Sequence, residues 1–599
     1  MPLIVQKFGG TSVADASKIL AAARRAIRAH RAGNKVVVVV SARGKTTDEL
    51  VAMAREIDQT PASREMDMLL STGEQVSVAL MAIAVQALGV PAISFTGAQI
   101  GIVTDSFHTK ARIKNISTER MVQALDEGKV VIVAGFQGVD EQYNITTLGR
   151  GGSDTTAVAL AAVLGADACE IYTDVDGVYT TDPRIVPEAR RVDRISFDEM
   201  LELASLGAGV MHSRSIEFAK KYGVPIHVRS SFTDAPGTWI VGEGDARRLG
   251  VHVTGAALAK DEARITLTGV PDRPGVVHAI FRTIAESNIV VDMIVQNAAT
   301  AGVTVVSFTV ASGDLADTLR VAEIAAKAVG ATGVTHDAQV SKVSIVGLGM
   351  RTHTGVAREM FAALAREGVN IQMITTSEIK VSVLVDRASG PRALKVVHAA
   401  FQLEREAADL PGISEVPPTS GRAHTKAQPT ENAKGSDGRM LAGMEDVVVS
   451  GVELDDRQAR ITLRDVPDRP GFAAGVFDRI ADAGVFVDMI VQDAGFDGLT
   501  HLSFTVPSQQ AERAADAVRA EAEGRVQVEP SIAKLSVIGV GMRTHTGVAT
   551  RMFGALAERG ININLINTSE VRINVATDAA SGPRAIEALT EAFDLGAGA

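Results

Sequence analysis

Short, fully apolar runs alternate with longer segments of helical periodicity over about the first 245 residues. Val36–Val40 is five consecutive valines, and Val130–Val133 is a second apolar run. Runs of this length that are apolar at every position are typical of strands in a parallel sheet covered on both faces. Ala- and Leu-rich stretches between the runs, such as a helix expected from about Ala14 to His30, would supply the covering layers. The pattern predicts an α/β region with a largely parallel sheet.

The rest of the chain contains a duplication. The segment 271–275, Pro-Asp-Arg-Pro-Gly, recurs at 467–471, and each copy is followed at the same distance by Val-Asp-Met-Ile-Val-Gln. The nine residues 349–357 return unchanged at 541–549. Two copies, near 248–410 and 445–599, follow from these repeats.

Each copy itself holds two related modules. The strand-like segment 263–267 precedes a Pro-Gly turn and a helical pattern, and 342–346 precedes a Thr-Gly turn and a helical pattern. Segment 303–310 is rich in β-branched residues and bounded by Gly, which is typical of a strand. We therefore expect four small α+β modules. The polar, aperiodic stretch 411–444 between the copies is expected to be a flexible linker.

Composition narrows the class of protein. A chain of 599 residues should hold several domains. Its formal net charge of −11 argues against a nucleic-acid or anionic-membrane partner. One cysteine, Cys169, excludes an intrachain disulfide and a multi-thiolate zinc site. The start of the chain lacks the pattern of a signal peptide, and no apolar run is long enough to span a membrane, so we expect a cytoplasmic protein.

Two glycine-containing segments predict anion binding. Segment 7–12, Lys-Phe-Gly-Gly-Thr-Ser, lies between the first strand and a helix, where backbone N–H groups can approach a phosphate and a lysine adds positive charge. An ordinary tight turn is the alternative. Segment 148–157 also opens a helix and combines three glycines with Arg150 and Asp154. Its arginine could bind a carboxylate through two hydrogen bonds.

Two further segments are candidates. Glu74, in 71–75, is expected near a helix start, where it is either a functional group or an acid favoured by the helix dipole. Segment 173–184 follows a strand and offers an aromatic ring, several acids and Arg184. The alternative for this segment is a calcium loop, but it lacks the regular ligand alternation and the terminal Glu.

Together, these segments resemble the aspartate kinase family of the amino-acid kinase superfamily. Segments 7–12, 71–74, 149–154 and 172–179 stand in the family's order. The resemblance implies an amino-acid kinase catalytic domain over 1–245, followed by ferredoxin-like ACT domains. Here the two copies imply two pairs of ACT domains, at 248–410 and 445–599, rather than one pair.

The resemblance also implies transfer of the ATP γ-phosphoryl group to the β-carboxylate of L-aspartate, with Mg²⁺ bridging the phosphates. A carboxylate with a pKa near ~3.9 is already ionised at neutral pH, so the nucleophile needs positioning and charge neutralisation rather than a general base. The product, 4-phospho-L-aspartate, would serve lysine, threonine and methionine synthesis.

The family's catalytic and substrate roles carry over to particular positions of this chain. Lys7, Arg150 and Asp154 would be catalytic, with Arg150 on the aspartate α-carboxylate and Glu74 on its ammonium. The remaining implied aspartate-binding residues are Ser41, Thr47, Gly151, Gly152 and Ser153. The implied ATP-binding residues are Lys7, Phe8, Gly9, Gly10, Thr173, Asp174, Tyr179 and Arg184. No protein metal site is implied.

One position departs from the family pattern. Gly209 stands where many members have a lysine near the nucleotide, so Arg184 or Lys221 would carry more of that charge. Two alternatives stay open on the residues alone: a related kinase for another substrate, such as glutamate or uridylate, and an amino-acid sensor without catalysis. The retained Lys7, Arg150 and Asp154 count against the sensor.

The ACT resemblance implies effector sites and feedback inhibition by lysine, threonine or both. In the first copy the implied effector residues are Asp272, Gly275, Asp292, Gln296, Asn370, Ile371 and Ser377. In the second copy they are Asp468, Gly471, Asp488, Gln492, Asn562, Ile563 and Ser569. The alternative is a structural role as strand caps and turns. Because ACT sheets commonly pair side by side, we expect a homodimer or a higher homo-oligomer.

Overall fold

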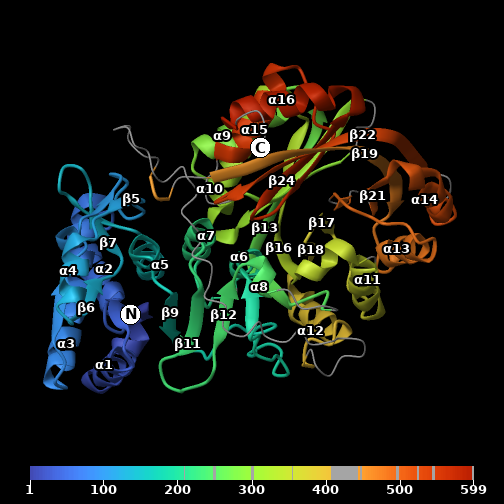
Figure 1. Cartoon of the computed structure of the whole chain (residues 1–599). Helices are drawn as coiled ribbons and strands as arrows, with labels where there is room; N and C mark the ends of the chain where they lie inside the picture. Colours follow the sequence, from blue (N-terminus) through green and yellow to red (C-terminus); the bar gives the residue numbers. More distant parts are fainter. Residues whose placement is uncertain are drawn as a thin grey trace.

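The computed structural model describes residues 1–207, 209–246, 251–297, 302–353, 355–406, 443–445, 448–493, 495, 498–522, 525–542 and 547–595. Figure 1 shows the N-terminal part on one side, in blue, teal and green, and the duplicated part on the other, in green to red. Most of the expected linker 411–444 falls outside the described residues; Gly443 and Met444 are described.

The N-terminal part is built on the expected parallel-rich sheet. Its strand order is β10-β12-β11-β9-β1-β2-β6-β3, and only the β11–β12 pair is antiparallel. The strands are β1 (Leu3–Phe8), β2 (Lys35–Val40), β3 (Ala92–Phe95), β6 (Val130–Ala134), β9 (Ala168–Thr173), β10 (Arg194–Ser196), β11 (Ile226–Ser230) and β12 (Thr238–Val241). A second, small sheet contains β4 (Ile102–Thr104), β5 (Ile113–Ile116), β7 (Gln137–Val139) and β8 (Ile145–Thr147).

The valine run of β2 shows why the sheet is covered on both faces. Val36, Val38 and Val40 pack in one core with α1 and α3, whereas Val37 and Val39 pack in another with α5, α6 and α7. Successive side chains of a strand point to opposite faces, so an all-valine strand requires two apolar layers. The helices are α1 (Ala16–Arg31), α2 (Thr46–Ile57), α3 (Ser63–Ala87), α4 (Glu119–Asp126), α5 (Gly152–Leu164), α6 (Phe197–Ser205), α7 (Ser213–Tyr222) and α8 (Glu243–Ala246).

One described helix, α3, is long and apolar enough by length and composition to cross a membrane. The sequence reading missed it because polar residues interrupt the apolar run. The helix packs against α1, β3 and β6 and buries Met81 and Val85 fully or almost fully. Its position is that of a helix within the core.

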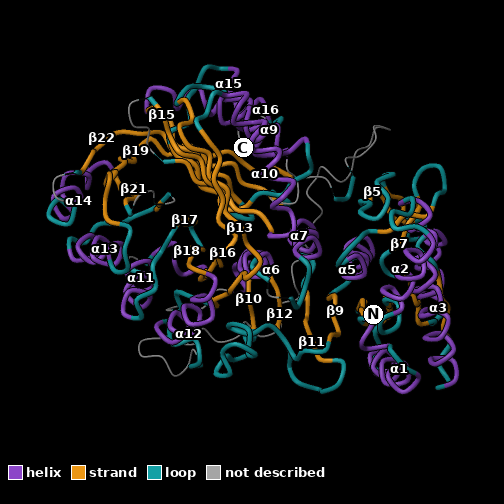
Figure 2. Tube along the Cα trace, turned by 180° about the vertical axis from the view of Figure 1, so that it is seen from behind, coloured by secondary structure: helices purple, strands orange, loops and turns teal. Residues whose placement is uncertain are grey.

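The duplicated part forms one closed sheet of twelve strands, in the order β13-β15-β14-β23-β24-β22-β19-β21-β20-β17-β18-β16. Figure 2 shows these strands gathered together with helices around them. The first copy holds β13 (Gly255–Pro271), α9 (Val276–Glu286), β14 (Asp292–Gln296), β15 (Val303–Ala311), α10 (Leu315–Val329), β16 (Gly333–Val346), α11 (Val356–Arg366), β17 (Met373–Ser377), β18 (Lys380–Asp386) and α12 (Gly390–Ala400). The second holds β19 (Val448–Pro467), α13 (Phe472–Asp482), β20 (Ile490–Gln492), β21 (Leu499–Pro507), α14 (Ala511–Val518), β22 (Val526–Val540), α15 (Gly547–Glu558), β23 (Leu565–Thr568), β24 (Arg572–Asp578) and α16 (Gly582–Ala592).

The two copies exchange partners within this sheet. Strand β14 of the first copy pairs with β23 of the second, and β17 pairs with β20. The apolar cores follow the same exchange, since Phe308 shares a core with Phe553, and Phe361 shares one with Phe504. The first module of each copy therefore packs with the second module of the other. The side-by-side pairing that motivated a homo-oligomer is made within one chain.

Helix α6 joins the N-terminal part to both copies. The Glu202 side chain is fully buried and lies 2.6 Å from Lys380 Nζ of the first copy. It also accepts a hydrogen bond from the Glu570 backbone N–H of the second copy. Burial raises the pKa of Glu202, and Lys380 opposes that rise. One buried carboxylate thus contacts equivalent turns of the two copies.

Candidate functional site

A cavity of about 1060 Å³ lies where loops following the parallel strands meet α3, α5 and α7. Ligand sites of open α/β sheets occur at the carboxyl ends of the strands. The sequence-predicted residues that line the cavity are Lys7, Gly10, Ser41, Thr47, Glu74, Arg150, Gly151, Gly152, Ser153 and Asp154. The structure therefore brings together the three candidate catalytic residues and the whole candidate aspartate-binding set.

Lys7 and Asp154 form an ion pair at the base of the cavity. Their side chains are 2.6 Å apart and only 12% and 13% exposed. Lys7 lies in β1, near its end, and Asp154 in the first turn of α5. Because β1 packs against α5, the two charges meet although 147 positions separate them. A buried cation held by one acid is suited to neutralising a further negative group.

The glycines around Lys7 allow neighbouring loops to approach closely. A Cβ added to Gly10 would lie 2.6 Å from the Ala42 carbonyl oxygen, and Gly44 N–H donates to the Gly10 carbonyl at 2.9 Å. Phe8 is fully buried and stacks on Tyr172 at a ring distance of 4.7 Å. Its side chain belongs to the core, so only its backbone is available to a nucleotide.

Glu74 occupies a different position on its helix from the one expected. It lies in the middle of α3 rather than near a helix start, which removes the helix-dipole explanation. One carboxylate oxygen accepts the Ala42 backbone N–H at 3.0 Å. The other is buried and has no hydrogen-bond partner among the described residues. Burial raises the pKa of Glu74 to about 7.

Several cations in the cavity wall were not recognised from the sequence. Lys110, Arg112 and Arg214 line the cavity together with exposed Arg150. The His212 ring also lines it, and burial lowers the pKa of that ring. Lys110 and Arg112 lie in the loop before β5, His212 directly precedes α7, and Arg214 lies in α7; none of these segments carries a glycine-rich signature. The cavity wall is of mixed charge, because acidic side chains also line it, namely Asp48, Glu74, Asp154, Glu217 and Glu445.

The candidate ATP residues of segment 173–184 do not line this cavity. Thr173 ends β9 and bonds its neighbour Asp174, and Tyr179 donates to Asp176 at 2.8 Å. Arg184 is 87% exposed and paired with Asp182. Lys221, the other candidate to replace the family lysine at Gly209, does line the cavity.

Comparison with known proteins identifies the family. The profile of the amino acid kinase family matches residues 2–230, and ACT domain profiles match 264–330, 343–401 and 535–593. An aspartate kinase of Stutzerimonas stutzeri is 52% identical over 407 residues, which are 68% of this chain and 99% of that protein. An aspartokinase of Mycolicibacterium smegmatis is 48% identical over 67% of this chain and 97% of its own length. The chain belongs to the aspartate kinase family.

Solved structures of the family agree with this assignment. Aspartate kinase from Synechocystis is 41% identical, covers 100% of this chain and 99% of its own, and superposes with a TM-score of 0.51. E. coli aspartokinase III, solved in complex with aspartate and ADP, is 27% identical over 66% of this chain and 99% of its own, with a TM-score of 0.58. This aspartate kinase family member is therefore a phosphotransferase with ACT domains, as the sequence predicted.

The ACT domains group the predicted effector residues differently from the sequence expectation. Asn370 was expected beside Asp272, but its side-chain amide donates to Asp468 at 2.9 Å, and Asn562 donates to Asp272 at 2.8 Å. Likewise, Gln296 bonds the Ile563 carbonyl and Gln492 bonds the Ile371 carbonyl. Each group thus combines one module from each copy, because the copies exchange partners. Gly275 and Gly471, both with left-handed φ, begin the helices beside these groups.

The remaining effector candidates lie beside the exchanged strands. Asp292 pairs with buried Lys342, and Asp488 pairs with Lys534. Ser377 and Asp488 line one cavity of about 410 Å³, again from different copies. Ser569 instead accepts the Arg572 backbone N–H at 3.1 Å and so stabilises a turn. By contrast, the space among Asn370, Asp468 and Gln492 is only about 10 Å³, so the group is closed by its own hydrogen bond.

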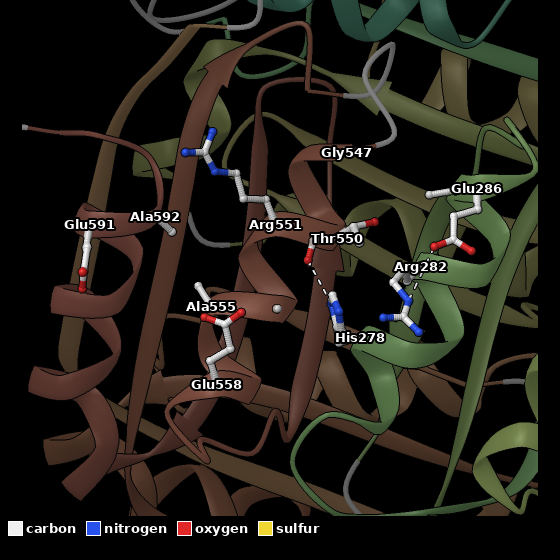
Figure 3. Close-up of a pocket in the computed structure, with 12 residues that line it drawn as sticks. His278, Arg282, Glu286, Gly547, Thr550, Arg551, Ala555, Glu558, Glu591 and Ala592 are labelled. Carbon is white, nitrogen blue, oxygen red and sulfur yellow. Dashed lines mark hydrogen bonds and ion pairs between the residues drawn. The ribbon is translucent and has the colours of Figure 1, made fainter.

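A further hollow lies between α9 and α15, where His278 contacts the Thr550 carbonyl (Figure 3). A Cβ on Gly554 would lie 2.9 Å from the His278 ring, so the glycine makes room for it. At the equivalent contact, α11 and α13 are joined by the Arg358–Asp478 ion pair at 2.6 Å. The two helix contacts are therefore equivalent in fold but not in the side chains that join them. No group of three or more His, Cys, Asp or Glu that could bind a metal occurs in the described residues.

Gly151→Ala is expected to lower kinase activity at least about tenfold, since misplacing a substrate loop by about an ångström can cost two orders of magnitude. Gly151 has φ of 71°, and a Cβ there would lie 2.3 Å from His212. The matched control is Gly165→Ala at the other end of α5, with φ of 61° but nothing within 4 Å. Initial rates and thermal melts would be compared. Equal activity in the two variants would contradict the prediction.

Proposed function

We propose that this chain transfers the γ-phosphoryl group of ATP to the β-carboxylate of L-aspartate, giving 4-phospho-L-aspartate. The observation that carries the proposal is the cavity holding the Lys7–Asp154 pair together with Arg150 and the unpartnered oxygen of Glu74. The E. coli structure in complex with aspartate and ADP supports the same pair of substrates.

The cavity offers opposite charges to two groups of aspartate, its α-carboxylate and its ammonium. Arg150, exposed at the rim, would bind the α-carboxylate, and Glu74 would accept hydrogen bonds from the ammonium. The β-carboxylate is then free to attack, and it needs no proton acceptor because it is already ionised. Ser41, Thr47 and Ser153 are close enough to the cavity to complete the substrate pocket.

Phosphoryl transfer depends on neutralising charge on the transferring group. Lys7 would neutralise that charge while Asp154 holds its ammonium in place, and the Gly9 and Gly10 backbone would approach the phosphates. Mg²⁺ bound between the phosphates would supply further positive charge. The nucleotide would be bound beyond the cavity by Thr173, Asp174, Tyr179 and Arg184. For this, the Arg184 guanidinium would have to leave the Asp182 carboxylate and pair with a phosphate.

Regulation by amino acids is part of the proposal. The E. coli relative has been solved with lysine and aspartate, and the ACT domains of this chain hold two equivalent polar groups, Asp272 with Asn562 and Asp468 with Asn370. Lysine or threonine would enter by replacing the Asn–Asp hydrogen bond.

A cytoplasmic location and a homo-oligomer complete the proposal. The free thiol of buried Cys169 is compatible with a reducing compartment.

Trapping an acyl phosphate with hydroxylamine tests the activity. Product is expected only with ATP, Mg²⁺ and aspartate, and Lys7→Met should reduce its rate by about 10³-fold or more because the transferring charge loses its counterion. Phosphorylation of glutamate or uridylate instead would favour a related kinase. Binding of amino acids without any product would favour a sensor.

Glu74 predicts how aspartate binding depends on pH. Its pKa of about 7 means that the free enzyme loses the ionised carboxylate as pH falls through 7, while the substrate ammonium stays protonated. The KM for aspartate should therefore rise below pH 7, by about tenfold per pH unit at the acid limit. Glu74→Gln should raise the KM at about pH 8 and flatten this dependence. A wild-type KM that is constant from about pH 5.5 to 8.5 would contradict the role.

The effector groups can be tested separately. Asp272→Asn and Asp468→Asn each remove one carboxylate while keeping the side-chain shape, and each variant is the matched control of the other. Loss of a charge-assisted contact should weaken amino-acid binding at the altered group by about tenfold or more, with kcat unchanged. Calorimetric titration with lysine and with threonine measures both groups. Unaltered binding in both variants would exclude them as ligands.

A further inference from the structure

A short segment from between the two copies is bound in the wall of the catalytic cavity. Met444 N–H donates to the Lys114 carbonyl at 3.1 Å, and Glu445 N–H donates to the Ile113 carbonyl at 3.3 Å, so the segment runs beside β5. The Met444 carbonyl accepts hydrogen bonds from Lys221 and from the Tyr222 hydroxyl, both at 3.0 Å. Met444 and Glu445 also line the cavity.

The Glu445 carboxylate is held by Arg214. One oxygen accepts hydrogen bonds from Arg214 Nε, at 2.8 Å, and from Arg214 Nη2. The Glu445 side chain is only 6% exposed, and that of Arg214 is 16% exposed. Burial raises the pKa of Glu445, and the guanidinium opposes that rise. The pair is thus a nearly buried ion pair between the segment and the second residue of α7.

The same guanidinium joins two loops of the cavity. Arg214 Nη1 donates to the Leu148 carbonyl, and Nη2 donates to the Ala111 carbonyl at 2.6 Å. Leu148 directly precedes the loop that carries Arg150 and Asp154, and Ala111 lies between Lys110 and Arg112. The two loops also touch, since a Cβ on Gly149 would lie 2.9 Å from the Thr109 carbonyl oxygen. Arg214 therefore fixes the loop proposed to bind aspartate.

We propose that Glu445 is a positioning residue for phosphoryl transfer, acting through Arg214 on the loop 148–154. A guanidinium presents its donors in a rigid planar fork, so a carboxylate on Nε and Nη2 fixes the direction in which Nη1 reaches Leu148. Without the carboxylate, a nearly buried cation is uncompensated and must turn toward solvent or another anion. The loop then loses its fixed anchor. This inference rests on the proposed function for the identity of the substrate.

The positioning group comes from outside the catalytic region. Glu445 lies at the expected start of the second copy, and the curated relatives match only about two thirds of this chain. Val540 and Gly541, at and just after the end of β22, line the same cavity. The second copy thus contacts the cavity at Glu445, which is charged, and at residues 540–541, which are not.

Glu445→Gln keeps the side-chain shape and removes the charge. We expect the KM for aspartate to rise about tenfold or more, with the KM for ATP within about twofold, because Arg214 bonds Leu148, directly before the loop proposed to bind aspartate, and Ala111, rather than the candidate nucleotide residues. Glu453→Gln is the matched control: Glu453 lies in β19, is 59% exposed and pairs with Arg572. That control should leave both KM values unchanged. If Glu445 had only a structural role, Glu445→Gln would lower the melting temperature, and the KM values for aspartate and ATP would change alike.

A double-mutant cycle and an activity-independent measurement complete the test. Arg214→Lys should raise the KM for aspartate as well, and the double variant should be no worse than the poorer single variant, because both changes remove one anchor. In Glu445→Gln, amide hydrogen exchange of peptides covering 148–154 should become faster, whatever the substrate is. An unchanged exchange rate of that loop would overturn the proposal. An unchanged KM for aspartate in Glu445→Gln would also overturn it. A lower KM for aspartate would do the same, because it would show that Glu445 competes with the substrate. Absence of aspartate-dependent product in the wild type would instead overturn the proposed function.

Discussion

Exchange of strands between the two copies is the constraint on which the regulatory part depends. Pairing of β14 with β23 and of β17 with β20 closes the sheet, so no strand of it is left as an unpaired edge among the described residues. Open edges invite pairing with other chains, and closure removes them. The same exchange forms both apolar cores and places each predicted effector group between copies. Neither copy would bury its core without the other.

The N-terminal part depends on a different constraint, the common edge at which parallel strands end. β1 and β2 run in the same direction, so the residues at their ends meet, and Lys7 and Ser41 face one cavity. Glu74 reaches the same cavity from the middle of α3. Two nearly buried ion pairs, Lys7–Asp154 and Arg214–Glu445, involve residues that line the cavity. Electrostatic contacts are stronger there than in water, because the local dielectric constant is low.

Helix α6 and the segment 443–445 connect the two parts. Glu202 contacts equivalent turns of both copies, one next to Ser377 and one next to Ser569. Helix α7 packs on α6 and carries Arg214, which donates to the Leu148 carbonyl directly before the loop that carries Arg150. Helices α6 and α7 therefore connect both copies to the cavity through packed contacts.

The sequence alone determined the fold class, the duplication and most of the catalytic cavity, because these follow from local pattern: valine runs, glycine turns beside strands, and exact repeats. It predicted that Lys7, Arg150 and Asp154 belong to one site, and in the structure all three line one cavity. Only the tertiary structure decided that Asn370 belongs with Asp468, that Glu74 lies in the middle of a helix, and that Glu445 reaches Arg214 over 231 positions. Periodicity reports which face of an element is buried, but it does not report which distant element covers that face. Two related copies make the choice of partner ambiguous, because each module offers a similar apolar surface to two possible neighbours. Only the closed packing of all four modules selects one.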